Sequence, residues 1–326
     1  VTDGAISPEV GQTIAAVFVI MFVTIGGMVA VAHTDLPNGI IIVSACLLAF
    51  PFVISTAGGW SHAREVLPAG NFAVFSPDFG KYPALKALSY FLSTLFLLLG
   101  VQSMYQKFYA AKSPAEAKNA RALWCVGAVV GETIVIVIAV YAFSYDVEHH
   151  MNWSGRSLVL NAARYMVPTP VGVLLLGAAC AVVLSTGMNY LLSSSSNVIR
   201  DIYQKMINPA SDPDKMVGLQ KVFIVVMGLC AFLMIFIPTY FKSEISVLRY
   251  AYFAYTMYGV SVTPALFAAL TWKRATRQGG VASIVGGALA TVFFEVLLPF
   301  LAPSVMIGTD AWGIPSFYPA AFISIS

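Results

Sequence analysis

Residues 176–203 read LGAACAVVLSTGMNYLLSSSSNVIRDIY, an apolar segment that fills with hydroxyl groups toward its end. Polar side chains recur about once per helical turn, so they fall on one stripe of an α-helix: Ser185, Asn189, Ser193 and Ser196, with Thr186 beside them. Hydrocarbon offers no hydrogen-bond partners, so in a membrane this stripe must face protein, a cavity or an ion. Such hydroxyls can join helices or bind a hard cation, and the spacing leaves both interpretations open.

The composition of the whole chain is that of a membrane protein. Of its 326 residues, 59% are hydrophobic and 10% are charged, whereas soluble domains carry about 25% charged residues. Eight apolar segments are long enough to span a bilayer: 11–29, 36–57, 84–106, 121–145, 170–197, 218–241, 246–271 and 281–302. We therefore predict an all-α, multi-pass membrane helix bundle whose environment is the lipid bilayer. The net charge of +3 gives no reason to expect nucleic acid as a partner.

Lysine and arginine predict the orientation of these segments. Eleven of the eighteen lie in or beside three short connections, at 107–121, 200–221 and 273–277. The positive-inside rule places these connections in the cytoplasm. The N-terminus and the loops near 58–83 and 146–169 are then predicted to be extracellular, in a protein of the plasma membrane.

The opening stretch carries a motif of two alanines, then LST, a serine cluster and RDIY. This motif resembles the eighth core helix of the sodium/solute symporter family. In that family the pair matched by Ser185 and Thr186 supplies hydroxyl ligands to the transported sodium ion, and a backbone carbonyl one turn earlier, here that of Val182, completes the share of this helix. The resemblance implies sodium as the coupling ion, with no catalytic residue and no resident cofactor.

A second motif, IGGMVAVAHTD, occupies residues 25–35. Its two glycines predict a helix break, and Asp35 with Pro37 fits the start of the next span, as an N-cap followed by proline in the first turn. The motif also resembles the start of the fifth core helix of the family, whose aspartate contributes to a second sodium site in the members that have one. Asp35 and Asn189 are therefore the candidates for a second site here, and both interpretations of Asp35 can hold together.

The third motif, GVQSMYQKFYAAKSPAEAKNA at 100–120, resembles the cytoplasmic end of the sixth core helix of the family. Its Lys107 and Lys112 are expected to anchor the helix at the lipid headgroups. Just before Gly100, where sugar-transporting members have an asparagine and aromatic residues that contact substrate, this chain has leucines and one phenylalanine at 95–99. Because sugar recognition needs convergent hydrogen-bonding groups, we do not expect a sugar as the solute.

Three further side chains are candidates for the solute pathway. Glu132 lies near the middle of a predicted span, where a carboxylate is costly and functional by default. A protonated glutamate that is hydrogen-bonded to a neighbouring helix is the alternative. Tyr255 and Tyr258 lie near one face of span 246–271 and deeper than an interfacial aromatic belt.

The resemblance runs from the fourth core helix to the start of the twelfth. It implies an inverted-repeat transporter fold, of which we expect the chain to be an internal fragment. Residues 1–326 would form one transmembrane domain, with the end of the first repeat at 11–57, the second repeat at about 83–272 and further helices at 281–326. The implied function is a symporter that imports a small organic solute with Na+. A transporter-like sensor domain of a signalling protein and a H+-coupled carrier using Asp35 or Glu132 are the alternatives, and the sequence indicates neither the solute nor the oligomeric state.

Overall fold

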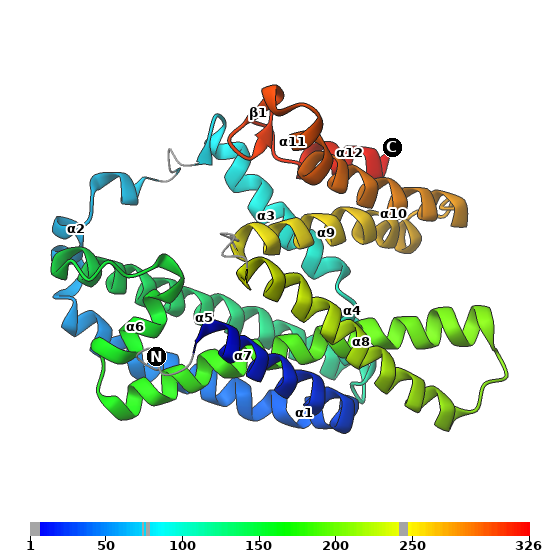
Figure 1. Cartoon of the computed structure of the whole chain (residues 1–326), viewed down its shortest axis with the longest axis horizontal. Coiled ribbons are helices and arrows are strands. Elements are labelled where there is room, and N and C mark those ends of the chain that lie inside the picture. Colours follow the sequence, from blue (N-terminus) through cyan, green and yellow to red (C-terminus); the bar gives the residue numbers. More distant parts are fainter. Residues whose placement is uncertain (1–6, 74, 76–78, 241–246) are drawn as a thin grey trace. The chain divides into compact units, whose positions relative to one another are not determined.

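The computed structural model describes the chain except for residues 1–6, 74, 76–78 and 241–246, and it is built almost entirely from helices (Figure 1). The α-helices are α1 (Pro8–Thr56), α2 (Gly59–Val66), α3 (Pro83–Gly100), α4 (Gln102–Tyr109), α5 (Pro114–His149), α6 (Leu158–Tyr165), α7 (Thr169–Ser196), α8 (Pro213–Tyr240), α9 (Val247–Thr271), α10 (Arg277–Val292), α11 (Leu298–Leu301) and α12 (Phe317–Ile325). Three segments of the described chain are 3-10 helices: η1 (Ala69–Phe72), η3 (Gly155–Ser157) and η6 (Pro303–Val305). Two are π-helices: η4 (Asn197–Ile207) and η5 (Phe293–Leu297). Strands β1 (Met306–Ile307) and β2 (Asp310–Ala311) form an antiparallel hairpin, with Met306 opposite Ala311.

Eight helical segments in the described part of the chain are long and apolar enough to cross a membrane. They are Glu9–Gly27, Val29–Thr56, Pro83–Tyr109, Pro114–His149, Thr169–Ile207, Asp214–Ile237, Leu248–Thr271 and Arg277–Leu301. Each corresponds to one predicted span, so the prediction of a multi-pass, all-α bundle is confirmed. Such long helices satisfy their own backbone hydrogen bonds, which is what a hydrocarbon environment demands.

The predicted break at the glycine pair lies inside α1, but the helix restarts sooner than expected. Gly27 adopts φ 57° and ψ −156°, a conformation that is open essentially only to glycine. Helical geometry then resumes at once, and the Thr34 hydroxyl already donates to the carbonyl of Ala30 at 3.1 Å. The prediction that Asp35 caps the next span is therefore wrong, because Asp35 lies inside the helix that begins near Val29.

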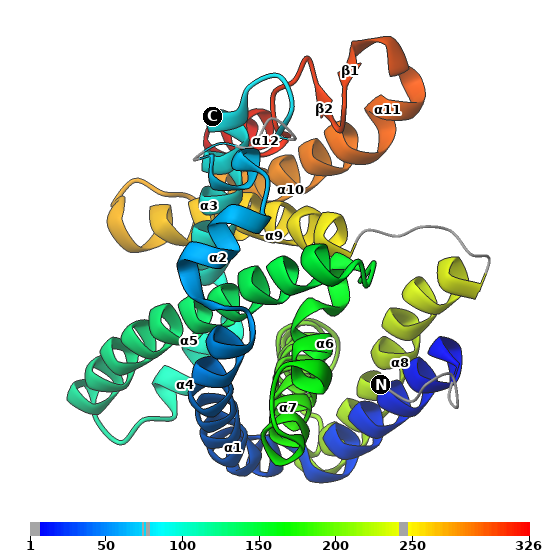
Figure 2. The same cartoon turned by 90° about the vertical axis from the view of Figure 1, so that its left-hand side faces the viewer.

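The chain forms two compact units, of which the first spans residues 1–68 and 107–243. Within it α1 packs along α7 and also contacts α5 and α8, as Figure 2 shows for α1 and α7. Its largest buried cluster is rich in small side chains, which let helix backbones approach closely: Ala45, Ala49, Ala142, Ala163 and Ala178. The short helix α6 packs against α5 and α7.

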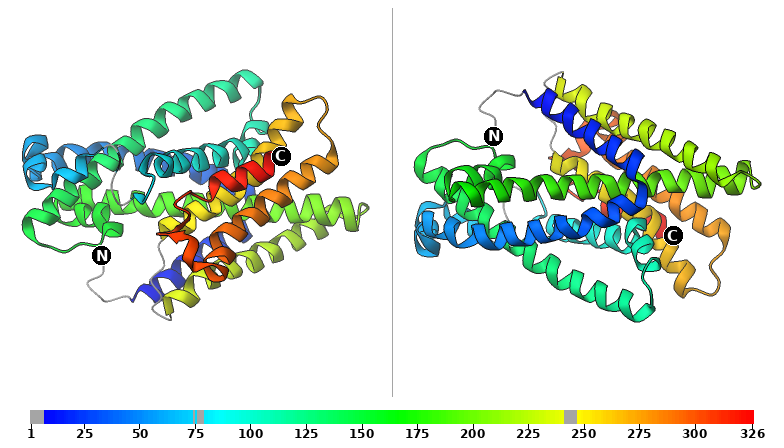
Figure 3. Two further views of the ribbon diagram at one scale, coloured as in Figure 1. Left: turned by 90° about the horizontal axis from the view of Figure 1, so that it is seen from above. Right: turned by 90° about the horizontal axis from the view of Figure 1, so that it is seen from below.

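The second unit spans residues 69–106 and 244–326. Helix α3 packs on α9, α9 on α10 and α10 on α12, and the last pair runs side by side in Figure 3. The approach of α10 to α9 is so close that a Cβ on Gly287 would lie 2.8 Å from the carbonyl oxygen of Val260. Residues 83–272, the predicted second repeat, contribute helices to both units, and the repeat relation stays a prediction.

Candidate functional site

The packing of α1 against α7 brings Asp35 onto the polar stripe of α7. The hydroxyl of Ser185 donates to Oδ1 of Asp35 at 2.7 Å. The amide Nδ2 of Asn189 lies 3.4 Å from both oxygens of the same carboxylate and donates to the backbone carbonyl of Ser185 at 2.8 Å. Three residues that the sequence proposed for sodium binding therefore form one cluster, although Asp35 and Ser185 are 150 positions apart.

A fourth member of this cluster, Lys107, was not among the candidate site residues. Sequence reasoning gave Lys107 only the role of a headgroup anchor, but its Nζ lies 2.8 Å from Oδ2 of Asp35. The side chain of Lys107 is 54% exposed and that of Asp35 is 22% exposed, so the lysine reaches a half-buried carboxylate from the end of α4. The sequence indicated only that an acidic side chain within a membrane span needs a partner. It did not indicate which lysine or arginine is that partner.

The hydrogen bonds of the cluster determine what Ser185 can offer to an ion. Because its hydroxyl proton points to Asp35, the two lone pairs of Oγ are directed elsewhere and remain able to accept a cation. A bond to an ionised acceptor is shorter and stronger than a neutral one. Asp35 thus fixes the orientation of a candidate sodium ligand, while its own charge is balanced by Lys107.

Val182 and Thr186, the other two candidates for the predicted sodium site, lie on the same helix as Ser185 and on its exposed side. Val182 is 46% exposed, and Thr186 one turn later is exposed as well. Two hydroxyls and the Val182 carbonyl would make three oxygen ligands, half of an octahedral shell. A sodium ion here would need further oxygens from another element, so these assignments stay predictions.

The rest of the stripe joins helices. Nε2 of Gln220 on α8 donates to the hydroxyl of Ser196 at 3.0 Å, and Ser196 in turn donates to the carbonyl of Leu192. Ser193 is buried in the same region. The helix-joining interpretation of the stripe therefore fits its end near Ser196, where α7 meets α8. The ion-binding interpretation of Ser185 and Asn189 stays a prediction.

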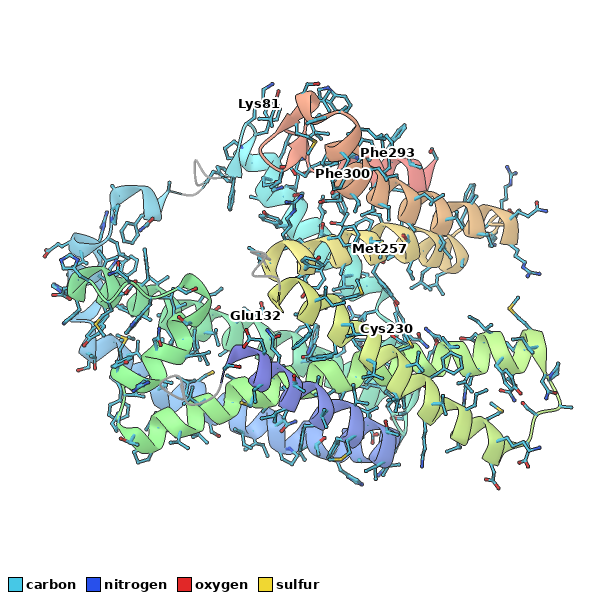
Figure 4. All side chains as sticks on the ribbon, viewed as in Figure 1. Lys81, Glu132, Cys230, Met257, Phe293 and Phe300 are labelled. Atoms are coloured by element: carbon cyan, nitrogen blue, oxygen red, sulfur yellow. The ribbon has the colours of Figure 1, made fainter. Side chains whose placement is uncertain are left out.

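The candidates for the solute pathway lie in different units. Glu132 is exposed on α5 of the first unit (Figure 4). Tyr258 belongs to α9 of the second unit, where its hydroxyl donates to the carbonyl of Gly100 at 3.2 Å. Tyr255 stands edge-on to Tyr252 with ring centroids 5.7 Å apart. The roles of these three side chains stay predictions.

A carboxylate, a hydroxyl and an amide gathered between two membrane-type helices are candidates for an ion or substrate pathway. The family model described as "Sodium:solute symporter family" matches residues 5–287, and the chain belongs to this family. This confirms the family suggested by the three sequence motifs.

Curated relatives include three bacterial sodium/proline symporters. The one from Escherichia coli (strain K12) is 23% identical over 303 residues, covering 89% of this chain and 57% of the relative. The one from Haemophilus influenzae (strain ATCC 51907 / DSM 11121 / KW20 / Rd) is 27% identical, covering 86% of this chain and 56% of the relative. The one from Staphylococcus aureus (strain bovine RF122 / ET3-1) is 24% identical, covering 97% of this chain and 60% of the relative. The chain thus spans less than two thirds of the length of the relatives it matches.

A solved structure shares the fold of this chain. It is the substrate-bound, outward-open state of a Na+-coupled sialic acid symporter that has a novel Na+-site. The TM-score is 0.73 at 16% identity, with coverage of 99% of this chain and 66% of the other. This similarity supports the helical transporter fold expected from the sequence.

Proposed function

We propose that the protein to which this chain belongs is a symporter of the plasma membrane that imports a small organic solute together with Na+. One observation carries the proposal: the Ser185 hydroxyl donates to Asp35, which leaves its lone pairs available to a cation beside Thr186. Family membership and the sodium/proline symporters among the relatives support the same coupling ion. Energy would come from the sodium gradient, and no covalent chemistry is involved.

We assign one tightly coupled sodium ion to a site that includes the Val182 carbonyl and the hydroxyls of Ser185 and Thr186. A second ion at Asp35 would have to compete with the ammonium of Lys107, which lies 2.8 Å from Oδ2. Asn189 adds a single amide, a sparse complement to that carboxylate. Asp35 thus serves mainly to orient Ser185, and its own charge is already matched by a cation of the chain.

For the solute, we propose a small amino acid such as proline. The support is the naming of the relatives together with the apolar residues before Gly100, where sugar-transporting members carry polar and aromatic contacts. The sialic acid symporter shares the fold at 16% identity, a likeness that carries no information on substrate.

Uptake of labelled L-proline by the full-length protein in proteoliposomes tests the proposal. An inward Na+ gradient should drive accumulation, and the double variant Ser185→Ala, Thr186→Ala should raise the half-saturating Na+ concentration about tenfold or more, since it removes two hydroxyl ligands to a charge. Thr13→Ala is the matched control, because Thr13 is an exposed helical threonine whose hydroxyl bonds its own helix. An unchanged Na+ dependence in the double variant would refute the site.

The same vesicles distinguish the competing coupling ions. Uptake in Na+-free buffer that rises as the external pH falls would indicate proton coupling through Asp35 or Glu132 instead. No uptake under any gradient, with a fused signalling module in the full gene, would favour a sensor.

A further inference from the structure

The turn between α9 and α10 in the second unit carries cationic side chains and no acidic one. Residues 272–280 read WKRATRQGG, in which Lys273, Arg274 and Arg277 are the charged residues. All three are exposed, and none of them forms an ion pair with a described residue. Like charges this close in sequence repel one another, so an anion at the turn would be stabilised by all of them.

The backbone of the turn keeps these cations together. Only residues 272–276 separate the two helices, and the amide of Ala275 donates to the carbonyl of Trp272 at 3.0 Å. The hydroxyl of Thr276 then caps α10 by accepting a hydrogen bond from the amide of Gly279 at 3.1 Å. Because one residue spans at most about 3.6 Å, the backbones of the first and last cations lie within about 15 Å of each other. The three charges therefore act on one small area.

The turn joins the ends of two membrane-type segments. One segment runs from Leu248 to Thr271 and the next from Arg277 to Leu301, so the cations lie where the hydrocarbon ends and the lipid headgroups begin. Long cationic side chains at such positions extend toward the headgroups. The predicted orientation places this turn on the cytoplasmic side, where the membrane leaflet carries anionic lipids.

Exposed apolar side chains border the turn on both helices. Phe267 and Leu270 lie one helical turn apart near the end of α9, and Trp272 follows them at 62% exposure. On α10 the exposed Val281 and Ile284 lie one turn apart as well. Tryptophan favours the boundary between headgroups and hydrocarbon. The acyl chains of a lipid bound at the cations would contact these side chains, whereas a soluble anion would leave them in water.

The other two cationic stretches of the chain differ from this turn because they contain acidic residues. The stretch around the end of α4 includes Glu116, and its Lys107 already pairs with Asp35. In the stretch from η4 to the start of α8, Nζ of Lys205 lies 2.7 Å from Oδ1 of Asp201, and two further aspartates follow. Their cations are thus partly neutralised by the chain itself. Charge complementarity to an anion is strongest at the turn between α9 and α10.

We propose that this turn binds an anionic phospholipid of the cytoplasmic leaflet. The headgroup phosphate would accept hydrogen bonds from Arg274 and Arg277, whose planar guanidinium groups match pairs of phosphate oxygens, and Lys273 would add a third positive charge. The acyl chains would lie against the exposed apolar side chains of α9 and α10. This lipid site is separate from the sodium cluster of the first unit and does not depend on which solute is transported.

Native mass spectrometry of the purified full-length protein in a neutral detergent tests the inference, since it resolves each bound lipid. Phosphatidylglycerol should bind more tightly than phosphatidylcholine with the same acyl chains. The triple variant Lys273→Gln, Arg274→Gln, Arg277→Gln should raise the Kd for phosphatidylglycerol about fivefold or more, which is roughly the contribution of one cation near an anionic surface. The single variants Arg274→Gln and Arg277→Gln should each show part of this loss, so the test does not depend on the triple variant alone.

The matched control replaces three exposed cations on the same predicted side of the membrane by glutamine, and it should keep most of the affinity: Lys112, Lys118 and Arg121. Equal affinity for the two lipids, or native affinity in the triple variant, would overturn the inference. An equal loss in the control would overturn it too, because it would indicate a diffuse attraction to all cationic loops.

Glycerol 3-phosphate carries the charged part of the headgroup without acyl chains. It should not displace the bound phosphatidylglycerol at millimolar concentration, and displacement would mean that the turn binds soluble anions and would overturn the lipid assignment. Sodium-driven uptake that depends on Ser185 is measured separately and reports on the proposed function alone.

Discussion

Replacing Lys107 by glutamine should make Asp35 available to sodium. In the native chain the ammonium lies 2.8 Å from Oδ2 of Asp35. At that separation the attraction is about 1.5 kcal/mol at the dielectric of water and about 6 kcal/mol at an effective dielectric of 20. Because Lys107 is 54% exposed, the lower figure applies, and the net worth of exposed pairs is about 1 kcal/mol. Removing this competitor should strengthen sodium binding at Asp35 about five- to twelvefold.

The expected consequence is a change in coupling. With one sodium ion per cycle, a membrane potential of about −100 mV contributes about 2.3 kcal/mol per charge, enough for roughly 50-fold accumulation of a neutral solute. A second ion bound at Asp35 and Asn189 would add the same amount again. Parallel isotope fluxes of sodium and solute in proteoliposomes should therefore give a ratio near one for the native protein and a ratio that rises toward two in Lys107→Gln.

Lys112→Gln is the matched control, because Lys112 is an exposed lysine of the connection that follows α4 and should leave the ratio at one. A native ratio of two that drops to one on Asp35→Ala would refute the reasoning, since it would mean that sodium already occupies Asp35 despite Lys107. An unchanged ratio and unchanged sodium affinity in Lys107→Gln would show that the lysine does not compete with the ion.

Three further predictions concern other parts of the chain. Asp35→Asn should raise the half-saturating Na+ concentration several-fold in uptake assays, because Ser185 loses a charged hydrogen-bond acceptor. Lys86→Met should lower the stability of the purified protein by about 3–5 kcal/mol, since it leaves Asp310 buried without its partner; a melting temperature equal to that of Lys81→Met would contradict this. Cysteines introduced into the cationic loops at 107–120, 198–217 and 272–280 should react with an impermeant reagent only from the cytoplasmic side. Labelling of these cysteines from outside intact cells would refute the orientation.

The parts of the fold that could be predicted are those in which neighbouring residues determine the outcome. Eight runs of apolar residues became eight membrane-type helices, because hydropathy and length are local properties. The N-cap assigned to Asp35 failed for a local reason as well. Proline at position 37 suggested that a helix starts there. In the structure the non-helical backbone is confined to Gly27. The eight residues that follow Gly27 are already helical.

Partners across the chain could not be predicted in this way. The polar stripe indicated that Ser185 and Asn189 need hydrogen-bond partners inside the membrane. A carboxylate such as that of Asp35 needs a cation there. Eleven lysines and arginines on the predicted cytoplasmic side were available for that purpose, and only the packing of α1, α7 and the end of α4 selects Lys107, 72 positions away. The buried ion pair of the second unit depends even more on tertiary structure, since Lys86 and Asp310 meet across 224 positions.

The identity of this cation matters more for the proposed mechanism than the number of oxygens near Asp35. A carboxylate between membrane-type helices must be neutralised, and either a free sodium ion or a tethered ammonium can do so. If sodium neutralises Asp35, each cycle moves that charge across the membrane, whereas the charge of Lys107 stays with the protein. The same hydrogen bond from Ser185 to Asp35 is compatible with both cases, so the proposed sodium site at Ser185 does not by itself determine how many ions are coupled. In this chain the ammonium 2.8 Å from Asp35 favours one.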